Sequence, residues 1–256
     1  MNCGETIREK MERIGAGVVI PTYNNAATVA AVVAGALEQS PCVIVVDDGS
    51  TDSTAAELAR FGGAIELVSC SPNRGKGCAL REGFRRAREL GLRYAVTLDS
   101  DGQHYPEDIG RFAAAAEKYP DMLLLGSRGL EHANMPRGNT FANRFSNFWF
   151  AVQTFRRLPD TQTGYRLYPL RRMAGMRFFT SRYEAELEML VRAVWAGIGV
   201  APIPVRVYYA PEGERVSHFR KGRDFARISL LNTLLCMAAV VYGWPSMLFH
   251  RIFGRR

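Results

Sequence analysis

The sequence predicts an α/β protein whose mainly parallel sheet carries helices on both faces and is followed by a C-terminal amphipathic or hydrophobic helical segment. Hydrophobic residues make up 47% and charged residues 23% of the 256 residues, which excludes a disordered chain. Short β-branched runs alternate with helical stretches in the first half, as in right-handed βαβ crossovers. Four of these runs are almost continuously apolar, which is typical of strands covered on both faces.

The first half of the chain supplies most of the expected elements. An Ala-rich stretch and an amphipathic stretch separate the apolar runs, and Pro106 is placed where a helix begins. We expect strands at 17–21, 43–48, 64–69, 94–99 and 121–128, with helices at 26–39, 50–61, 75–91 and 106–119.

The second half has a looser pattern. Helices are expected at 139–157 and 183–197, and an extended segment at 164–169. The segment 199–209 contains two prolines, which predicts an edge strand because proline cannot donate to a neighbouring strand.

The net charge of +8 is unevenly distributed. Residues 1–127 carry 13 basic and 17 acidic side chains, whereas residues 128–172 carry 8 and 2, and residues 211–256 carry 8 and 3. A basic excess often indicates nucleic acid or an anionic membrane. No nucleic-acid-binding motif accompanies this charge, so we expect an anionic membrane surface and phosphate groups as partners, and no nucleic acid.

The five cysteines and the N-terminus indicate the compartment. Cys3, Cys42, Cys70, Cys78 and Cys236 are odd in number and lack CxxC or zinc spacing, which predicts buried reduced thiols in a cytosolic protein. Residues 1–15 have no apolar core and do not form a signal peptide. The catalytic part is therefore expected in the cytoplasm.

Polar clusters follow four of the expected strands. They are Pro21–Asn24, Asp47–Ser50, Asp99–Asp101 and Gly126–Arg128. Because parallel α/β sheets bind ligands at the carboxyl ends of their strands, we expect these clusters to converge on one edge.

Asp99 and Asp101 are the candidate metal ligands. Two carboxylates at a strand end suit Mg²⁺ or Mn²⁺, which prefer oxygen ligands and complete their shells with water and phosphate. Gln103 and His104 are close enough to add a ligand or a phosphate contact. The alternative is that these acids cap the helix near Pro106.

Two further clusters have both a structural and a functional interpretation. The segment Asp47–Asp52 can form a turn and a helix cap, or accept hydrogen bonds from a nucleobase or ribose. The segment Asn73–Gly77 brings two cations to a helix N-terminus, where anions are favoured, although it is not a Walker loop. The alternative for this second segment is a solvated turn.

Taken in order, these motifs resemble family 2 glycosyltransferases. The residues that carry the resemblance are VVIPTYNN, VIVVDDGSTDST, NRGKGCALREGF and TLDSDGQHYPEDI, followed by GSRG, DTQTGYRLYP, YEAELEMLVRA and PIPVRVYY. DSDGQH is similar to the branch that makes dolichyl- or polyprenyl-phosphate sugars. The resemblance covers roughly residues 16–220.

The resemblance implies a GT-A (Rossmann-like) fold, a nucleotide-sugar donor and an inverting transfer of a hexose. It divides the chain into an N-terminal extension (1–15), a catalytic domain (16–212, with the donor half to about 128) and a basic acceptor loop with membrane-associating helices (213–256). Donor binding is implied for Pro21, Tyr23, Asn25, Asp48, Lys76 and Asp99, and metal binding for Asp99, Asp101 and Gln103. Acceptor-phosphate binding is implied for Arg128, Arg166, Arg215, Ser217 and His218.

Two positions depart from the family pattern. Asn25 stands where Glu is usual, which affects the expected nucleobase contact, and His218 stands where Lys is common, which affects the phosphate clamp. The sequence does not identify the sugar, the nucleobase or the lipid, and it does not decide whether the chain forms a homo-oligomer.

The nature of the acceptor decides which catalytic groups are needed. A lipid phosphate is already a nucleophile, so it requires only cations such as Arg128 and Arg166. A sugar hydroxyl requires a carboxylate base, for which Asp160 is the best candidate. Glu184 and Glu186 are alternatives, although a solvated or salt-bridged helix face explains them more simply.

Two other functions fit the sequence less well. A catalytically silent nucleotide-sugar-binding protein is disfavoured by the intact set Asp99, Asp101 and Gln103. A nucleotidyltransferase is expected to have a Gly-rich loop after its first strand, and PTYNNAATV contains no glycine.

The segment 228–253 is the most apolar in the chain. Its uncharged part, Ile228–Tyr242, is fifteen residues long, and Gly243 and Pro245 follow it. A membrane span needs roughly 20 apolar residues. Because both flanks are basic, we expect a helix or hairpin lying in the cytoplasmic interface, with spanning and packing on the protein as alternatives.

Overall fold

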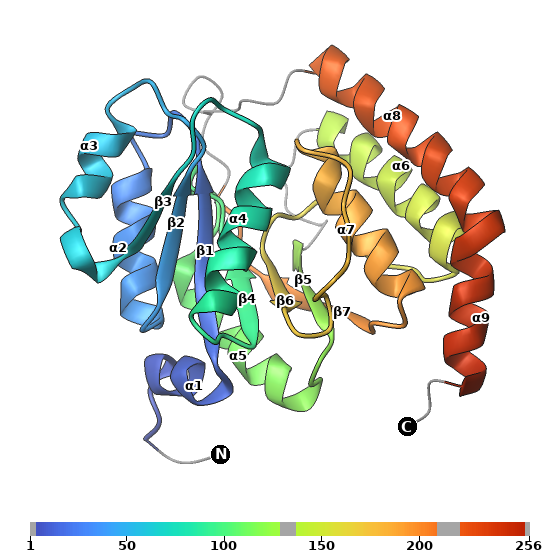
Figure 1. The fold of residues 1–256 in the computed structure, drawn as a ribbon, viewed down its shortest axis with the longest axis horizontal. Coiled ribbons are helices and arrows are strands. Elements are labelled where there is room, and N and C mark those ends of the chain that lie inside the picture. The colour runs from blue at the N-terminus through green and yellow to red at the C-terminus, as the bar shows by residue number, and fades with distance from the viewer. Residues whose placement is uncertain (1–3, 129–136, 209–220, 254–256) are drawn as a thin grey trace.

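A seven-stranded sheet forms the centre of the computed structural model, which describes residues 4–128, 137–208 and 221–253 (Figure 1). The strands follow the order β3-β2-β1-β4-β6-β5-β7, and only β6 runs antiparallel to its neighbours. They are β1 (Ala16–Thr22), β2 (Val43–Asp47), β3 (Glu66–Ser69), β4 (Tyr94–Thr97), β5 (Leu123–Arg128), β6 (Arg166–Pro169) and β7 (Val200–Val205). The predicted mainly parallel sheet is confirmed.

The strand predictions hold within a few residues. All side chains of β1, β2, β4 and β6 are buried, as expected of strands covered on both faces. The proline-containing β7 lies at the edge of the sheet, next to β5. The cysteine prediction is only partly right, because the four described cysteines are free thiols but are half-buried: Cys42, Cys70, Cys78 and Cys236.

Helices cover both faces of the sheet, as predicted. Helices α2 (Val29–Gln39) and α5 (Ile109–Lys118) share one core with β1 and β2, while α4 (Lys76–Glu89) and α7 (Glu184–Trp195) share the other. Figure 1 shows α6 (Arg137–Thr154) and α8 (Lys221–Ala238) side by side beyond α7. The short elements are α3 (Thr54–Ala59) and the 3₁₀ turns Gly62–Ala64 and Pro106–Asp108.

The N-terminal extension contains a helix that the sequence did not reveal. Helix α1 (Ile7–Ile14) begins at Thr6, whose side chain and Glu9 form a reciprocal capping box. Met11 is fully buried, and α1 packs against α5 and β1. Helix α1 is short and mostly charged, and only Met11 and Ile14 are buried, so its apolar pattern is too weak to predict the helix from the sequence.

The topology collects several segments at one edge of the sheet. The chain moves from β1 to β2 and β3 on one side and returns to β4 on the other, which opens a crevice at the carboxyl ends of β1 and β4. Because β6 is antiparallel, its first residue, Arg166, lies at this same edge and pairs with Thr97 and Leu125. The N-termini of α4 and α7 also face the crevice and supply lining residues.

The C-terminal segment is one continuous helical run and not a hairpin. Helix α8 passes through a π turn (Ala239–Gly243) into α9 (Trp244–Phe253), so Gly243 and Pro245 do not reverse the chain (Figure 1). The π turn and the position of Pro245 in the first turn of α9 accommodate the missing proline N–H. The hairpin form of the prediction is therefore wrong.

This run has two apolar sides. By length and composition alone, Ala226–Phe253 is long and apolar enough to cross a membrane, which by itself is weak evidence because core helices pass the same criterion. Leu231, Leu235 and Ala239 are buried against the domain. The opposite side exposes large apolar side chains, namely Leu230, Leu234, Met237, Val240, Val241, Tyr242, Leu248, Phe249, Ile252 and Phe253.

Candidate functional site

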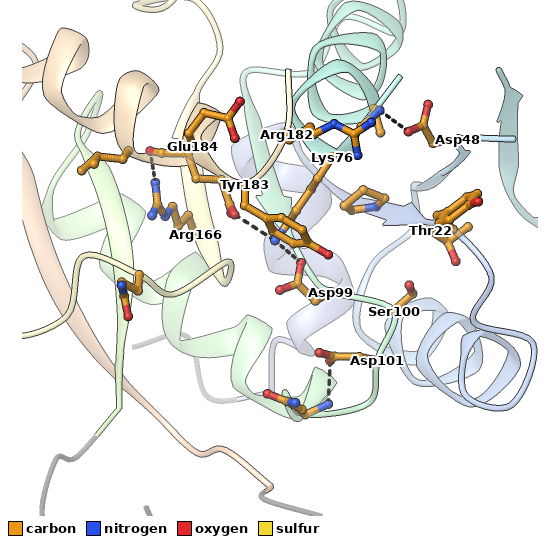
Figure 2. A pocket seen from close by; sticks show the side chains of 18 of the residues that line it. Thr22, Asp48, Lys76, Asp99, Ser100, Asp101, Arg166, Arg182, Tyr183 and Glu184 are labelled. Atoms are coloured by element: carbon orange, nitrogen blue, oxygen red, sulfur yellow. Dashed lines mark hydrogen bonds and ion pairs between the residues drawn. The ribbon is translucent and has the colours of Figure 1, made fainter. Parts of the chain in front are cut away.

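A pocket of about 880 Å³ occupies the carboxyl edge of the sheet, and its size suits a ligand such as a nucleotide sugar (Figure 2). Most of the residues predicted for the site line it: Pro21, Tyr23, Asn25, Asp48, Lys76, Asp99, Asp101, Gln103, Arg128 and Arg166. The predicted convergence of the strand-end clusters is therefore observed. Arg215, Ser217 and His218 lie outside the described residues.

Lys76 links three segments at the centre of this pocket. Its ammonium lies 2.7 Å from Asp99 Oδ1 at the end of β4 and 2.9 Å from Glu186 Oε2 on α7. Figure 2 shows Lys76 extending toward Asp99. Burial lowers the pKa of Lys76, but the two carboxylate charges outweigh burial and raise it above its usual value, so the ammonium stays protonated.

Asp99 and Asp101 differ in their charge environment. Burial raises the pKa of Asp99, but the charge of Lys76 outweighs it and the net change is downward. For Asp101, burial and the nearby charge of Asp99 raise the pKa to about 6. Asp101 is thus a partly buried carboxylate beside a second carboxylate, which is an arrangement that a bound cation stabilises.

The donor set fits Mg²⁺ or Mn²⁺. Asp99 and Asp101 offer hard carboxylate oxygens at one wall of the pocket, and Gln103 lines the same wall. Among the described residues, no three acidic, cysteine or histidine side chains are grouped to hold a metal unaided. This fits an ion that completes its coordination with water and diphosphate oxygens.

Residues that follow β1 hold the turn Asp99–Ser100–Asp101 by hydrogen bonds. Asn25 Nδ2 donates to Ser100 Oγ at 2.8 Å, and Thr28 Oγ1 donates to the Ser100 carbonyl at 2.6 Å. Asn25 also lines the pocket with a buried Oδ1 that has no partner among the described residues. Asn25 therefore positions the two aspartates around Ser100 and keeps one acceptor for a ligand. No sequence signal pointed to Thr28.

Asp48 holds the loop before α4. Its carboxylate accepts hydrogen bonds from the backbone N–H of Arg74 at 3.0 and 3.2 Å and from that of Gly75 at 2.6 Å. Gly75 has φ +100°, a conformation that favours glycine. Asp48 thus has a structural role that neither interpretation of the Asp47–Asp52 segment included, and it also lines the pocket.

Arg128 and Asp160 form an ion pair across the far wall. Arg128 Nη2 lies 2.9 Å from Asp160 Oδ1, and Nε donates to Oδ2. Asp160 is 1% exposed and also accepts from the backbone N–H of Gln162. The carboxylate is occupied with orienting the guanidinium, which lines the pocket.

Arg166 is fully buried and serves the architecture of the site. Its guanidinium donates to the carbonyls of Thr163, Glu186 and Thr161 at 2.7, 2.7 and 2.9 Å. These bonds tie the loop before β6 to α7. Its other described hydrogen bond goes to the Tyr168 hydroxyl at 3.5 Å, so the described bonds of this guanidinium are used within the protein, although Arg166 also lines the pocket.

Glu184, Glu186 and Gly164 have roles at the site that the sequence pattern did not indicate. Both glutamates are buried pocket residues, so the expectation of a solvated helix face is wrong, although Glu186 does form an ion pair. A Cβ at Gly164 would overlap Asp99 Oδ2 and Lys76 Nζ. The helical pattern of α7 gave no indication that its first turn enters the crevice.

His104 does not line the pocket. Its ring packs against Tyr165 with centroids 5.1 Å apart, and burial lowers its pKa to about 4. At neutral pH it is therefore an uncharged, buried side chain.

Comparisons with known proteins agree with this geometry. Residues 17–179 match the family described as glycosyl transferase family 2. The chain is 30% identical over 198 residues to glycosyltransferase AglJ of Haloferax volcanii, covering 77% of this chain and 64% of that protein. It is also 30% identical to polyprenol monophosphomannose synthase of Mycolicibacterium smegmatis, covering 73% and 75% of the two chains.

A solved structure shares the fold. Glucosyl-3-phosphoglycerate synthase from Mycobacterium tuberculosis, crystallised with Mn²⁺, UDP and phosphoglyceric acid, superposes with a TM-score of 0.67 at 18% identity. The similarity covers 93% of this chain and 84% of that one. At this identity the likeness shows the fold alone, and the predicted GT-A architecture is confirmed.

We expect Asp101→Asn to stabilise the metal-free protein at neutral pH. Because the folded-state pKa of Asp101 is about 6 and its ordinary value is 3.8, the folded chain binds this proton more tightly, and stability from this group is lost as pH rises through 6. The substitution should raise the free energy of unfolding by about 1–3 kcal/mol at pH 7.5 and change it little at pH 3.5. Chemical denaturation with a chelator present measures both values.

The matched control is Asp99→Asn, which should act in the opposite direction because it leaves Lys76 without one partner. Equal or lower stability of Asp101→Asn at pH 7.5 would contradict the electrostatic description of this wall.

Proposed function

The chain belongs to glycosyltransferase family 2, and on this premise we propose that it transfers a hexose, with inversion, from a GDP- or UDP-sugar to a polyprenyl or dolichyl phosphate at the cytoplasmic face of a membrane. The observation that carries the proposal is the ion pair in which Asp160 presents Arg128 to the donor pocket. The name of the mycobacterial relative, polyprenol monophosphomannose synthase, supports the same acceptor class.

The donor half of the pocket suits a nucleotide sugar. Pro21, Tyr23, Asn25 and Asp48 line the side formed by β1 and β2 and are proposed to hold the nucleoside. Asp99 and Asp101, with Gln103, would hold Mg²⁺ or Mn²⁺ beside the diphosphate. When bound, the ion would neutralise the charge that develops on the nucleoside diphosphate as it leaves.

Lys76 provides a second positive charge near the diphosphate. It is protonated and held by Asp99 and Glu186, so it is already in place before the leaving group becomes fully charged. Preorganised charge of this kind stabilises a transition state without further rearrangement.

The acceptor half suits a phosphate. An oxygen of the lipid phosphate attacks C1 of the sugar, a C1–O bond forms, and the bond from C1 to the β-phosphate oxygen breaks with its electron pair. The nucleophile is already anionic, so no proton has to be removed, but two anions must be brought together. Arg128 lines the pocket where it can reduce this repulsion.

The pairing of Asp160 argues against the hydroxyl-acceptor alternative. A general base needs a free oxygen directed at the nucleophile. Both Asp160 oxygens accept hydrogen bonds from Arg128, and Asp160 itself is not among the residues that line the pocket. Its proposed role is therefore to orient Arg128.

The packing of α8 and α9 supports placement in the membrane interface. Asn232 on α8 bonds with Gln153 on α6 at 3.0 Å, and Ser246 on α9 donates to the Trp195 carbonyl at 2.8 Å. Gly243 lies so close to the Trp195 ring that a Cβ would overlap it. The run is attached to the domain along its length, so crossing the bilayer would require breaking these contacts, whereas its exposed apolar side is free to enter the interface.

The pocket reaches this membrane-facing element. Ile228, at the start of the apolar part of α8, and Leu187 on α7 both line it. We propose that the first isoprene units of the acceptor lie against these two side chains.

The transfer reaction itself is directly testable. Purified protein with Mn²⁺, radiolabelled GDP- or UDP-hexose and short polyprenyl phosphate should form a labelled lipid, and Asp101→Asn should lower turnover by ~100-fold or more because a metal-binding charge is lost. Thin-layer chromatography separates the products. Nucleotide-sugar binding without transfer to any phosphate lipid would instead favour a silent binding protein, and full activity of Asp101→Asn would refute the metal assignment.

The role of Asp160 has its own signature. We expect Asp160→Asn to raise the KM for the lipid phosphate and to lower kcat/KM by ~10- to 100-fold, because Arg128 loses its partner. The pH profile of kcat should keep its shape, whereas loss of a base would remove its acidic limb. Unchanged donor binding serves as the control for folding.

Membrane association should depend on the exposed side of α8 and the π turn. We expect the double variant Leu234→Asp and Val241→Asp to reduce flotation with anionic vesicles by ~10-fold or more. Val241 is 82% exposed, and the variant replaces two apolar contacts with lipid by charges. Transfer to a water-soluble short-chain acceptor should persist. Flotation equal to the unmodified protein would contradict the placement.

A further inference from the structure

A second cavity lies away from the donor pocket. It has a volume of about 770 Å³ and is lined mainly by apolar side chains from the last turns of α6, the segment after it and the start of α9. The apolar lining residues are Phe148, Ala151, Val152, Phe155, Leu158 and Trp244. Figure 1 shows the end of α6 beside the junction of α8 and α9, and Trp244 from the start of α9 lines this α6–α9 groove.

Two aromatic residues of the α6–α9 groove are held in unusual states. Phe155 has φ +52°, which is disfavoured for a bulky side chain, and it remains 70% exposed while its ring contacts Trp244 at 5.0 Å. The buried indole N–H of Trp244 has no hydrogen-bond partner among the described residues. An apolar ligand in the groove would cover the exposed Phe155 ring.

The rim of the groove is basic. Arg144 and Arg157 line it and are exposed, and neither has an ion-pair partner in the part of the chain that the structure describes. Two unpaired guanidinium groups beside an apolar cavity complement an amphiphile whose headgroup is a phosphate.

A hydrogen-bonded wall separates this groove from the donor pocket. Asn147 lines the groove, and its Oδ1 accepts from the N–H of Thr161 at 3.0 Å and from its hydroxyl at 2.8 Å. Thr161 lines the donor pocket and also bonds with Ser146 at 2.8 Å. The two cavities share no lining residue, so an acceptor lipid that extends from Arg128 past Ile228 would lie outside the α6–α9 groove.

We propose that the α6–α9 groove binds one anionic phospholipid of the membrane, with an acyl chain on Phe148, Ala151 and Trp244 and its phosphate between Arg144 and Arg157. This inference rests on the proposed membrane placement and deepens it, because Trp244 in the groove belongs to the helical run that is assigned to the bilayer. The bound lipid would hold the end of α6, whose Ser146 lies in the donor pocket wall, against the C-terminal helices.

The test uses monomeric lipids, so it does not require membrane binding. Dihexanoyl phosphatidylglycerol and dihexanoyl phosphatidylcholine, both below their micelle concentrations, are titrated into the full chain by calorimetry. We expect one saturable site with phosphatidylglycerol bound about 3- to 10-fold more tightly, which is the range for exposed charge contacts.

Three variants separate headgroup, chain and background effects. The double variant Arg144→Gln and Arg157→Gln should lower phosphatidylglycerol affinity to that of phosphatidylcholine, and Ala151→Leu should weaken both lipids because it fills the groove. Arg156→Gln, an exposed neighbour that does not line the groove, is the matched control and should bind like the unmodified protein. Unchanged thermal stabilisation by a nucleoside diphosphate verifies that each variant is folded.

Several outcomes overturn the assignment. The proposal is refuted if the two lipids bind with equal affinity, or if the Ala151→Leu variant binds them as the unmodified protein does. If farnesyl phosphate displaces phosphatidylglycerol from the groove even in the Arg128→Gln variant, the groove is an acceptor subsite instead. If the protein is a dimer that Ala151→Leu dissociates, the groove is a contact between two copies. If the protein floats with vesicles and transfers sugar but lacks the phosphatidylglycerol site, the groove assignment fails while the proposed function stands.

Discussion

The architecture of the site depends on the two ion pairs that the ammonium of Lys76 forms. This ammonium connects the N-terminus of α4, the end of β4 and the first turn of α7 through Asp99 and Glu186. A buried charge of this kind is stable only while its partners remain, since a lone ammonium or carboxylate in the same place would be strongly unfavourable. Gly164 follows from the same constraint, because any side chain there would occupy the space of the ion pair. The buried ammonium therefore requires these three segments to stay close together.

Much of the fold and part of the site could be predicted from the sequence. The apolar runs near β1, β2 and β4 are long enough to identify buried parallel strands, and the acids that follow them had to meet at one edge. Pocket residues such as Asp99 and Asp101 are therefore predictable from their position after a buried strand. The roles of Arg166 and Glu184 could not be predicted, because they depend on how an antiparallel strand and a distant helix pack beside the crevice.

The C-terminal helices show a different limit of sequence reasoning. The short uncharged stretch and Pro245 favour a break in the helix. In the structure a π turn precedes Pro245, and the run stays helical. The count of apolar residues also could not reveal that Leu231 and Leu235 face the protein while Leu230 and Leu234 face outward. A helix that is apolar on both sides can use one side for the domain and the other for a second hydrophobic phase.

The attachment of α8 and α9 to α6 and α7 has a consequence for how substrates meet. If the outer side of these helices rests in the bilayer, the bonds Asn232–Gln153 and Ser246–Trp195 fix the height and tilt of the catalytic crevice above the lipid. A lipid-linked substrate then has to be found only by lateral diffusion in a plane, while the soluble donor arrives from the third dimension. Rigid anchoring would convert a search through volume into a search over area, with the opening at Ile228 as its fixed end point.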